Sequence, residues 1–184
     1  PRAVDVINRL SQKPYRILHI AAHGEFAIGA AEGGRRSGVL LSDGLMLTAA
    51  EIQQMEFVPD LVFLNCCHLG QIDGRSVSRG VEYHRLASSL ARELIDMGVR
   101  AVVVAGWAVD DQAAHRFAEA FYRALMHDGR TFGLAVHQAR CETYRAFPSS
   151  NTWGAFQAYG DPGFRLDPSR PSGSGANGAP GFVA

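Results

Sequence analysis

The stretch LVFLNCCHLG at residues 61–70 is an apolar run that ends in two cysteines and a histidine. Two further runs, RILHIAA at 16–22 and AVVVAGW at 101–107, are also rich in apolar and β-branched residues and lack helical spacing. Such runs are typical of strands that are covered on both faces, as in parallel sheets. The three runs therefore predict the centre of a mainly parallel sheet.

Helical patterns lie between and after these runs. Their apolar stripes, capping residues and terminal glycines predict helices over residues 48–55, 86–97, 110–128 and 133–147. SGVLLSDG at 37–44 suits a further strand or hairpin, and WGAFQAYGD at 153–161 an edge strand. Strands that alternate with helices of this length form βαβ units. We therefore predict an α/β fold with helices on both faces of the sheet.

Composition excludes several classes of protein. The 18 basic and 18 acidic residues balance, so no whole-chain field attracts nucleic acid or an anionic membrane. No apolar run approaches the roughly 18 residues that cross a bilayer. The 3 cysteines are odd in number and two are adjacent, which disfavours a disulfide framework and favours a reduced, cytoplasmic protein.

The chain is predicted to hold one folded domain and a tail. Its length of 184 residues suits a single domain, and the stretch from Asp167 onward is rich in Gly, Pro and Ser. We predict a domain over residues 1–166 and a flexible tail or linker over 167–184. The absence of an initiator Met and the linker-like tail suggest a fragment of a longer multidomain protein.

The chemistry is expected at the strand ends, because ligands of open parallel sheets bind outside the carboxyl ends of the strands. The first run is followed by His23 and Gly24, and the second ends in the adjacent cysteines. A free thiol has a pKa of about 8.5, so a neighbouring imidazole is needed to make it a nucleophile at neutral pH. His23 and one cysteine therefore form a candidate pair for acyl transfer.

The period-two geometry of a strand separates the two cysteines. Cys66 continues the face of Val62 and Leu64, and free cysteine is among the most buried residue types. Cys67 is the first residue past the apolar run and is expected on the turn that follows it. Cys66 is therefore interpreted as a packing residue and Cys67 as the nucleophile candidate.

Four stretches in order resemble a known family: HIAAHGEF (19–26), LVFLNCCHLG (61–70), GVRAVVVAGWAVDDQAA (98–114) and WGAFQAYGDP (153–162). They are similar to the CHAT domain, a caspase-like domain associated with tetratricopeptide repeats, of the separase and caspase clan. The resemblance implies a caspase-like three-layer α/β/α sandwich with a mainly parallel central sheet. It also implies a cysteine endopeptidase with a His-Cys dyad and no metal or organic cofactor.

The resemblance assigns roles to single residues. His23 corresponds to the second histidine of the pattern His-x-Ala-x-His-Gly, and Cys67 to the cysteine of Leu-Ser-Ala-Cys-x-Thr-Gly. The backbone amides of Gly24 and Cys67 would form the oxyanion hole. The chain departs from the family around the nucleophile, where Asn65, His68 and Leu69 replace the usual Ser, Glu and Thr.

The resemblance also indicates substrate-binding residues and partners. The loop after the third run, with Trp107, Asp110 and Asp111, would line the pocket for the substrate's P1 side chain, and either aspartate could pair with a basic one. Asp111 could equally begin a helix as an N-cap or a first-turn acid. The partners implied are a protein substrate and fused or associated sensor or repeat modules, in bacterial defence or cell death.

Three alternatives remain open at the level of the sequence. The domain could be a catalytically silent caspase-like module that binds peptides. A zinc site could form from the histidines and cysteines near 23 and 66–68, although consecutive residues on a turn seldom converge on one ion. The loop at 71–80 is either a solvated connection or a segment that is cleaved during activation.

His19 is expected to be a buried, hydrogen-bonded core residue.

Overall fold

A mainly parallel sheet forms the centre of the protein. It contains β1 (Ile17–His23), β4 (Leu61–Cys67), β5 (Ala101–Ala105) and β6 (Phe156–Gly160), in that order. β1, β4 and β5 are parallel, and β6 runs antiparallel to β5. The computed structural model describes residues 3–23, 38–40, 46–48, 58–67, 87–167 and 169. The predicted parallel sheet is confirmed.

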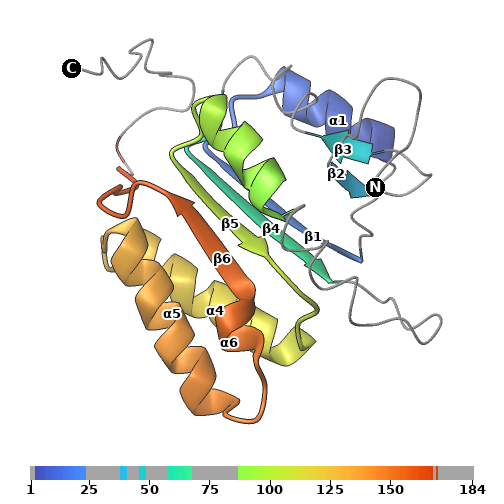
Figure 1. The fold of residues 1–184 in the computed structure, drawn as a ribbon. Helices are drawn as coiled ribbons and strands as arrows, with labels where there is room; N and C mark the ends of the chain where they lie inside the picture. Colours follow the sequence, from blue (N-terminus) through green and yellow to red (C-terminus); the bar gives the residue numbers. More distant parts are fainter. Residues whose placement is uncertain are drawn as a thin grey trace, which may run out of the picture.

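Helices cover both faces of this sheet (Figure 1). α4 (Asp111–Tyr122) and α5 (Phe132–Ala146) lie on one side. α1 (Ala3–Gln12) and the helical residues 87–96 lie on the other side. The layers confirm the α/β/α sandwich predicted from the sequence, and α1 is an addition to the helices that the sequence patterns predict.

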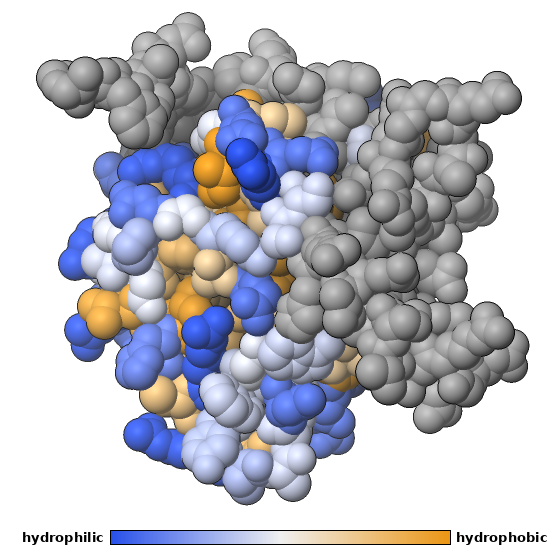
Figure 2. Space-filling model, in the orientation of Figure 1, coloured by the Kyte–Doolittle hydropathy of each residue, from blue (hydrophilic) through white to orange (hydrophobic). Residues whose placement is uncertain are grey.

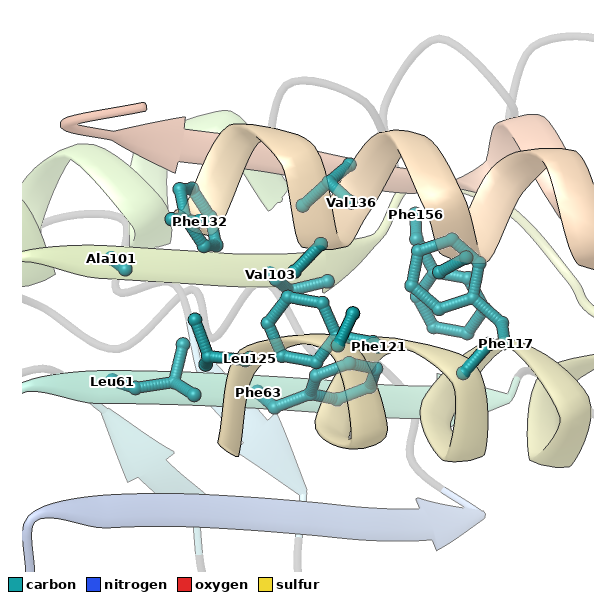
Figure 3. Close-up of a cluster of buried hydrophobic side chains, with 14 of the residues drawn as sticks. Leu61, Phe63, Ala101, Val103, Phe117, Phe121, Leu125, Phe132, Val136 and Phe156 are labelled. Atoms are coloured by element: carbon teal, nitrogen blue, oxygen red, sulfur yellow. The ribbon is translucent and has the colours of Figure 1, made fainter. Parts of the chain in front are cut away.

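The alternation of β4 divides its side chains between two cores. Leu61 and Phe63 belong to the cluster under α4 and α5, whereas Val62 and Leu64 belong to the cluster on the opposite face. Figure 3 shows the first cluster, in which Phe63 lies among aromatic rings of α4. Burying each of these large apolar side chains stabilises the fold by roughly 1.5–3 kcal/mol, so β4 is held firmly on both faces.

Several predicted helix ends are confirmed. The helical residues 87–96 are followed by Gly98, which adopts a left-handed conformation with φ 102°. α4 continues into the π-helical turn η2 (Arg123–His127), and Gly129 follows with φ 61°. α5 ends at Ala146, before Pro148. Glycine is favoured at such ends because it adopts positive φ without steric cost.

The short elements differ in part from the predictions. β2 (Gly38–Leu40) lies within the strand or hairpin expected at 37–44, but its antiparallel partner β3 (Met46–Thr48) lies beyond that range and includes Thr48, which was predicted to begin a helix. The helix predicted from 48 falls outside the described residues beyond Thr48. The strand predicted from 153 begins only at 156, because residues 152–155 form the helical turn α6 (Thr152–Ala155).

The described surface is mostly hydrophilic. In Figure 2, hydrophilic residues predominate on the described surface and the apolar ones form separate areas among them. Scattered exposed apolar residues of this kind are normal on soluble folds.

The last described residues pack against the core: Phe164 and Leu166 are buried in the cluster under α4 and α5. The boundary at 166 stays a prediction, since residues 170–184 fall outside the described part of the chain.

Candidate active site

The last pair of the β1–β4 ladder joins the two predicted catalytic positions. The strands pair without a break from Ile17 with Leu61 to His23 with Cys67. His23 is the last residue of β1 and Cys67 the last residue of β4. Neighbouring strands lie about 4.8 Å apart. The backbones of His23 and Cys67 are therefore direct neighbours at the carboxyl-terminal edge of the sheet.

The prediction that Cys67 lies on the turn after the strand is wrong. Cys67 is the final residue of β4, and the apolar run continues as a strand for one residue beyond Cys66. The extension follows from the partner strand, because β1 also runs as far as His23 and supplies the ladder. Gly24 and His68 fall outside the described residues.

Paired positions of β1 and β4 share a face of the sheet. The ring of His19 is stacked on that of its partner Phe63, with centroids 4.6 Å apart. The next pair on this face is Ala21 with Asn65, and Ala21 is exposed. The face that α4 covers near Phe63 is thus exposed to solvent at Ala21.

His19 is hydrogen-bonded as predicted, but it is not buried. Its Nδ1 lies 2.9 Å from the hydroxyl of Tyr122, and the residue is exposed. The partial loss of solvent against the sheet lowers the pKa of His19, because burial disfavours the charged imidazolium. The prediction of a core histidine fails because β1 lies beside only one strand of the described sheet, so part of the ring stays in solvent.

Asn65 carries an orphaned polar atom. The residue is half-buried, and its Oδ1 is buried without a hydrogen-bond partner among the residues that the structure describes. An unsatisfied buried acceptor costs about 1–3 kcal/mol, and folded proteins contain few of them. In the sequence, Asn65 stands out only as a departure from the family pattern. Its orphaned acceptor is a tertiary property that no local pattern could reveal.

The loop after β5 is held at both ends by α6. The amide of Gly106 donates to the carbonyl of Ala155 at 2.9 Å, and the amide of Asp110 donates to Oγ1 of Thr152 at 2.9 Å. Trp107 lies against α6, since a Cβ at Gly154 would stand 3.6 Å from its Cζ2. The position of Trp107 beside the strand ends therefore depends on α6, a contribution that the sequence analysis missed.

Asp110 is the N-cap of α4. It has extended backbone angles, φ −74° and ψ 131°, and its Oδ1 accepts a hydrogen bond from the amide of Ala113 at 2.9 Å. Asp111 is an exposed acid in the first turn of the helix. The sequence allowed Asp111 to be either the N-cap or an acid of the first turn. The structure shows that Asp110 is the N-cap and that Asp111 lies in the first turn. A role of either residue in substrate binding stays a prediction.

Replacing Asp110 by alanine is expected to lower the free energy of unfolding by about 1 kcal/mol, because the amide of Ala113 loses its acceptor. The midpoint of thermal unfolding should fall by roughly 2–4 °C for a domain of this size. Asp110→Asn is the matched control, since asparagine caps helices about as well as aspartate. Equal loss in both variants would contradict the capping role and point to the charge instead.

The zinc alternative has no support from the described residues. No group of three or more His, Cys, Asp and Glu residues that could hold a metal occurs in the described part of the chain. The cysteines and histidines of that alternative lie at the margin of the described residues or beyond it. The absence of metal stays a prediction.

Comparison with known proteins identifies the family. A search of the curated proteins finds no match to the chain. Among the helices of the described residues, none has both the length and the apolar character needed to span a membrane. The family model of the CHAT domain matches residues 3–161, which include every strand of the central sheet and the candidate pair. The match confirms the resemblance seen in the sequence and indicates a caspase-like, protease-related module. The chain belongs to the CHAT domain family.

Proposed function

We propose that this CHAT domain is a cysteine endopeptidase with His23 and Cys67 as its catalytic dyad. The observation that carries the proposal is the pairing of the two residues as the last rung of the β1–β4 ladder. Histidine and cysteine are the residues that nucleophilic acyl transfer requires, and the carboxyl-terminal edge of a parallel sheet is where ligands bind. The family match supports the same reading.

The reaction proceeds in two acyl-transfer steps. His23 accepts the proton of the Cys67 thiol, and the thiolate attacks the carbonyl carbon of the scissile peptide bond. The carbon–nitrogen bond breaks, the amine leaves with the proton from His23, and a thioester remains on Cys67. Water then gives a proton to His23 and attacks the thioester carbon. The carbon–sulfur bond breaks, the carboxylic acid leaves, and His23 returns the proton to the Cys67 thiolate.

Backbone amides of Gly24 and Cys67 stabilise the oxyanion of each tetrahedral intermediate. Donors that are fixed before the reaction cost little reorganisation, which is why such a site contributes strongly to the rate. Gly24 directly follows β1 in the sequence, and Cys67 is the last residue of β4. The assignment of these two amides rests on the family resemblance.

The P1 side chain of the substrate binds to Trp107, Asp110 and Asp111. Trp107 follows β5 at the same edge, and the two aspartates stand at the start of α4. Carboxylates and an indole suit a basic P1 side chain, through ion pairing and cation–π contact. The substrate is a partner protein, and fused or associated sensor or repeat modules regulate its cleavage in a cytoplasmic defence or cell-death protein.

Alkylation by iodoacetamide tests the dyad without a known substrate. In a Cys66→Ala background at pH 6.5, Cys67 is expected to react roughly tenfold or more faster than Cys141, because a partner imidazole raises its thiolate fraction. Cys141 is a free cysteine on α5 and serves as the reference in a His137→Ala background, because its Sγ otherwise lies 3.7 Å from Nε2 of His137. Mass spectrometry of the two peptides gives both rates in one sample.

The variant His23→Ala is expected to remove the advantage of Cys67 and leave the rate at Cys141 unchanged. Equal, slow labelling of both cysteines, with no response to His23→Ala, would refute the dyad. That outcome would instead support a silent caspase-like module that binds peptides.

A further inference from the structure

Asn65 is the polar residue that lies nearest to the dyad positions on the β1–β4 ladder. Its register partner is Ala21, and the next pair on the same face is His23 with Cys67. The pair before Ala21 and Asn65 on this face is His19 with Phe63. Their rings stack on each other, which shows that the side chains of these positions lie on one side of the sheet. Side chains alternate along strands, so positions 65 and 67 share this face.

The described strand positions around Asn65 offer no hydrogen-bond donor from a side chain. Phe63 precedes it on the same face, and Ala21 is its partner on β1. On β5, Ala105 follows the register partner of Leu64 and belongs to the same cluster as Phe63. His19 stands one pair further back, and its Nδ1 lies at 2.9 Å from the hydroxyl of Tyr122. The nearest polar positions in the other direction are those of the dyad.

We propose that Asn65 is a positioning residue for His23, with its Oδ1 accepting a hydrogen bond from the imidazole. The inference rests on the proposed peptidase function and adds a third member to the dyad. A ring nitrogen that donates to Asn65 carries the proton of the neutral imidazole, which leaves the other nitrogen free to accept the proton of Cys67. The same carbonyl oxygen stabilises the imidazolium after proton transfer, as in other Cys-His-Asn sites.

This role explains why a buried acceptor is kept in the strand. An orphaned carbonyl destabilises the fold, and proteins retain such groups where function requires them. Asn65→Leu has nearly the same shape and loses only the proposed bond to the imidazole, because Oδ1 has no partner among the described residues. The variant is therefore expected to keep or raise the midpoint of thermal unfolding and at the same time to slow the reaction of Cys67. A purely structural asparagine would lose stability and rate together.

A double-mutant cycle tests whether Asn65 acts through His23. Alkylation of Cys67 is measured in four proteins that all carry Cys66→Ala: the parent, Asn65→Leu, His23→Ala and the double variant. Asn65→Leu is expected to slow alkylation roughly tenfold in the parent and to have no effect in the His23→Ala background. Asn65→Asp keeps an oxygen at the same place, so alkylation of Cys67 in this variant is expected to retain most of the parent's rate. Asn65→Ala provides the same comparison if leucine prevents folding.

The outcomes separate this inference from the proposed function. A rate that depends on His23 but not on Asn65 would overturn the positioning role and leave the dyad in place. An equal effect of Asn65→Leu with and without His23 would also overturn it, because Asn65 would then act on Cys67 by another route. Loss of any dependence on His23 would refute the dyad and the positioning role together.

Discussion

Replacing Cys67 by alanine is expected to abolish peptide cleavage by this domain, with a loss of at least roughly a thousandfold. The methyl group cannot form the thioester, so the only remaining route is direct attack by water on the bound peptide. The positions of His23 and the strand ends are unaffected by this small change. Digestion of a peptide library by the parent protein and by Cys67→Ala, followed by mass spectrometry, measures the loss for many sequences at once.

Cys66→Ala is the matched control for this experiment. Cys66 precedes Cys67 in β4, and the alternation of the strand assigns its position to the opposite face. Cleavage by Cys66→Ala is expected to stay within about twofold of the parent, as for substitutions away from a reacting centre. Loss of cleavage in Cys66→Ala but not in Cys67→Ala would reverse the assignment of the nucleophile.

The same library reports the preference for the P1 residue. Preferred cleavage after arginine or lysine that weakens in Asp110→Asn or Asp111→Asn would support an acidic pocket. Asparagine at 110 retains the helix cap, so this change isolates the charge of Asp110 from its structural role. Preference for apolar residues would restrict both aspartates to the start of α4.

Gly160→Ala is expected to destabilise the fold severely, by about 2–6 kcal/mol. Gly160 has φ 114°, which disfavours any side chain. Its Cβ would overlap the carbonyl oxygen of Arg100 and stand 3.1 Å from the Cα of Ala101, its register partner on β5. The same carbonyl accepts a hydrogen bond from the amide of Asp161 at 3.2 Å, so the end of β6 would have to leave the sheet. The midpoint of thermal unfolding should fall by roughly 10 °C.

Gly98→Ala separates backbone strain from steric overlap. Gly98 has a similar φ of 102°, but no atom of the described residues lies within 4 Å of the place of its Cβ. Its replacement is expected to cost only the strain of positive φ, about 1–3 kcal/mol. If Gly98→Ala proved as destabilising as Gly160→Ala, the steric overlap with Arg100 would contribute nothing to the loss of stability in Gly160→Ala.

The central strands were predictable because they are buried on both faces. Val62, Phe63 and Leu64 are fully enclosed, and a strand in that environment needs an apolar residue at nearly every position. Helix ends were predictable for a local reason as well, since Gly98 and Gly129 adopt positive φ where their helices stop.

The exact strand ends were less predictable because partner strands determine them. β4 extends to Cys67 since β1 supplies a partner there, and β5 stops at Ala105. Beyond it, the amide of Gly106 bonds to Ala155 of α6. α1 was missed because its pattern is short, and its Leu10 reaches the core only through packing with other elements.

Residue types at the strand ends indicated the candidate site, but their environments could not be predicted. The proximity of His23 to Cys67 follows from the sheet order, which the βαβ pattern and the family resemblance both imply. The orphaned oxygen of Asn65 and the contact between Trp107 and α6 depend on residues distant in sequence. Such contacts exist only in the folded chain.

The backbone ladder between β1 and β4 also has an evolutionary consequence. It aligns His23 with Cys67 through main-chain pairing, which any sequence compatible with a strand can maintain. Insertions or deletions in the segments that follow the two strands leave this pairing unchanged, because loop length has only a small effect on stability. Selection can therefore alter the residues that recognise a substrate while the reacting pair is inherited intact.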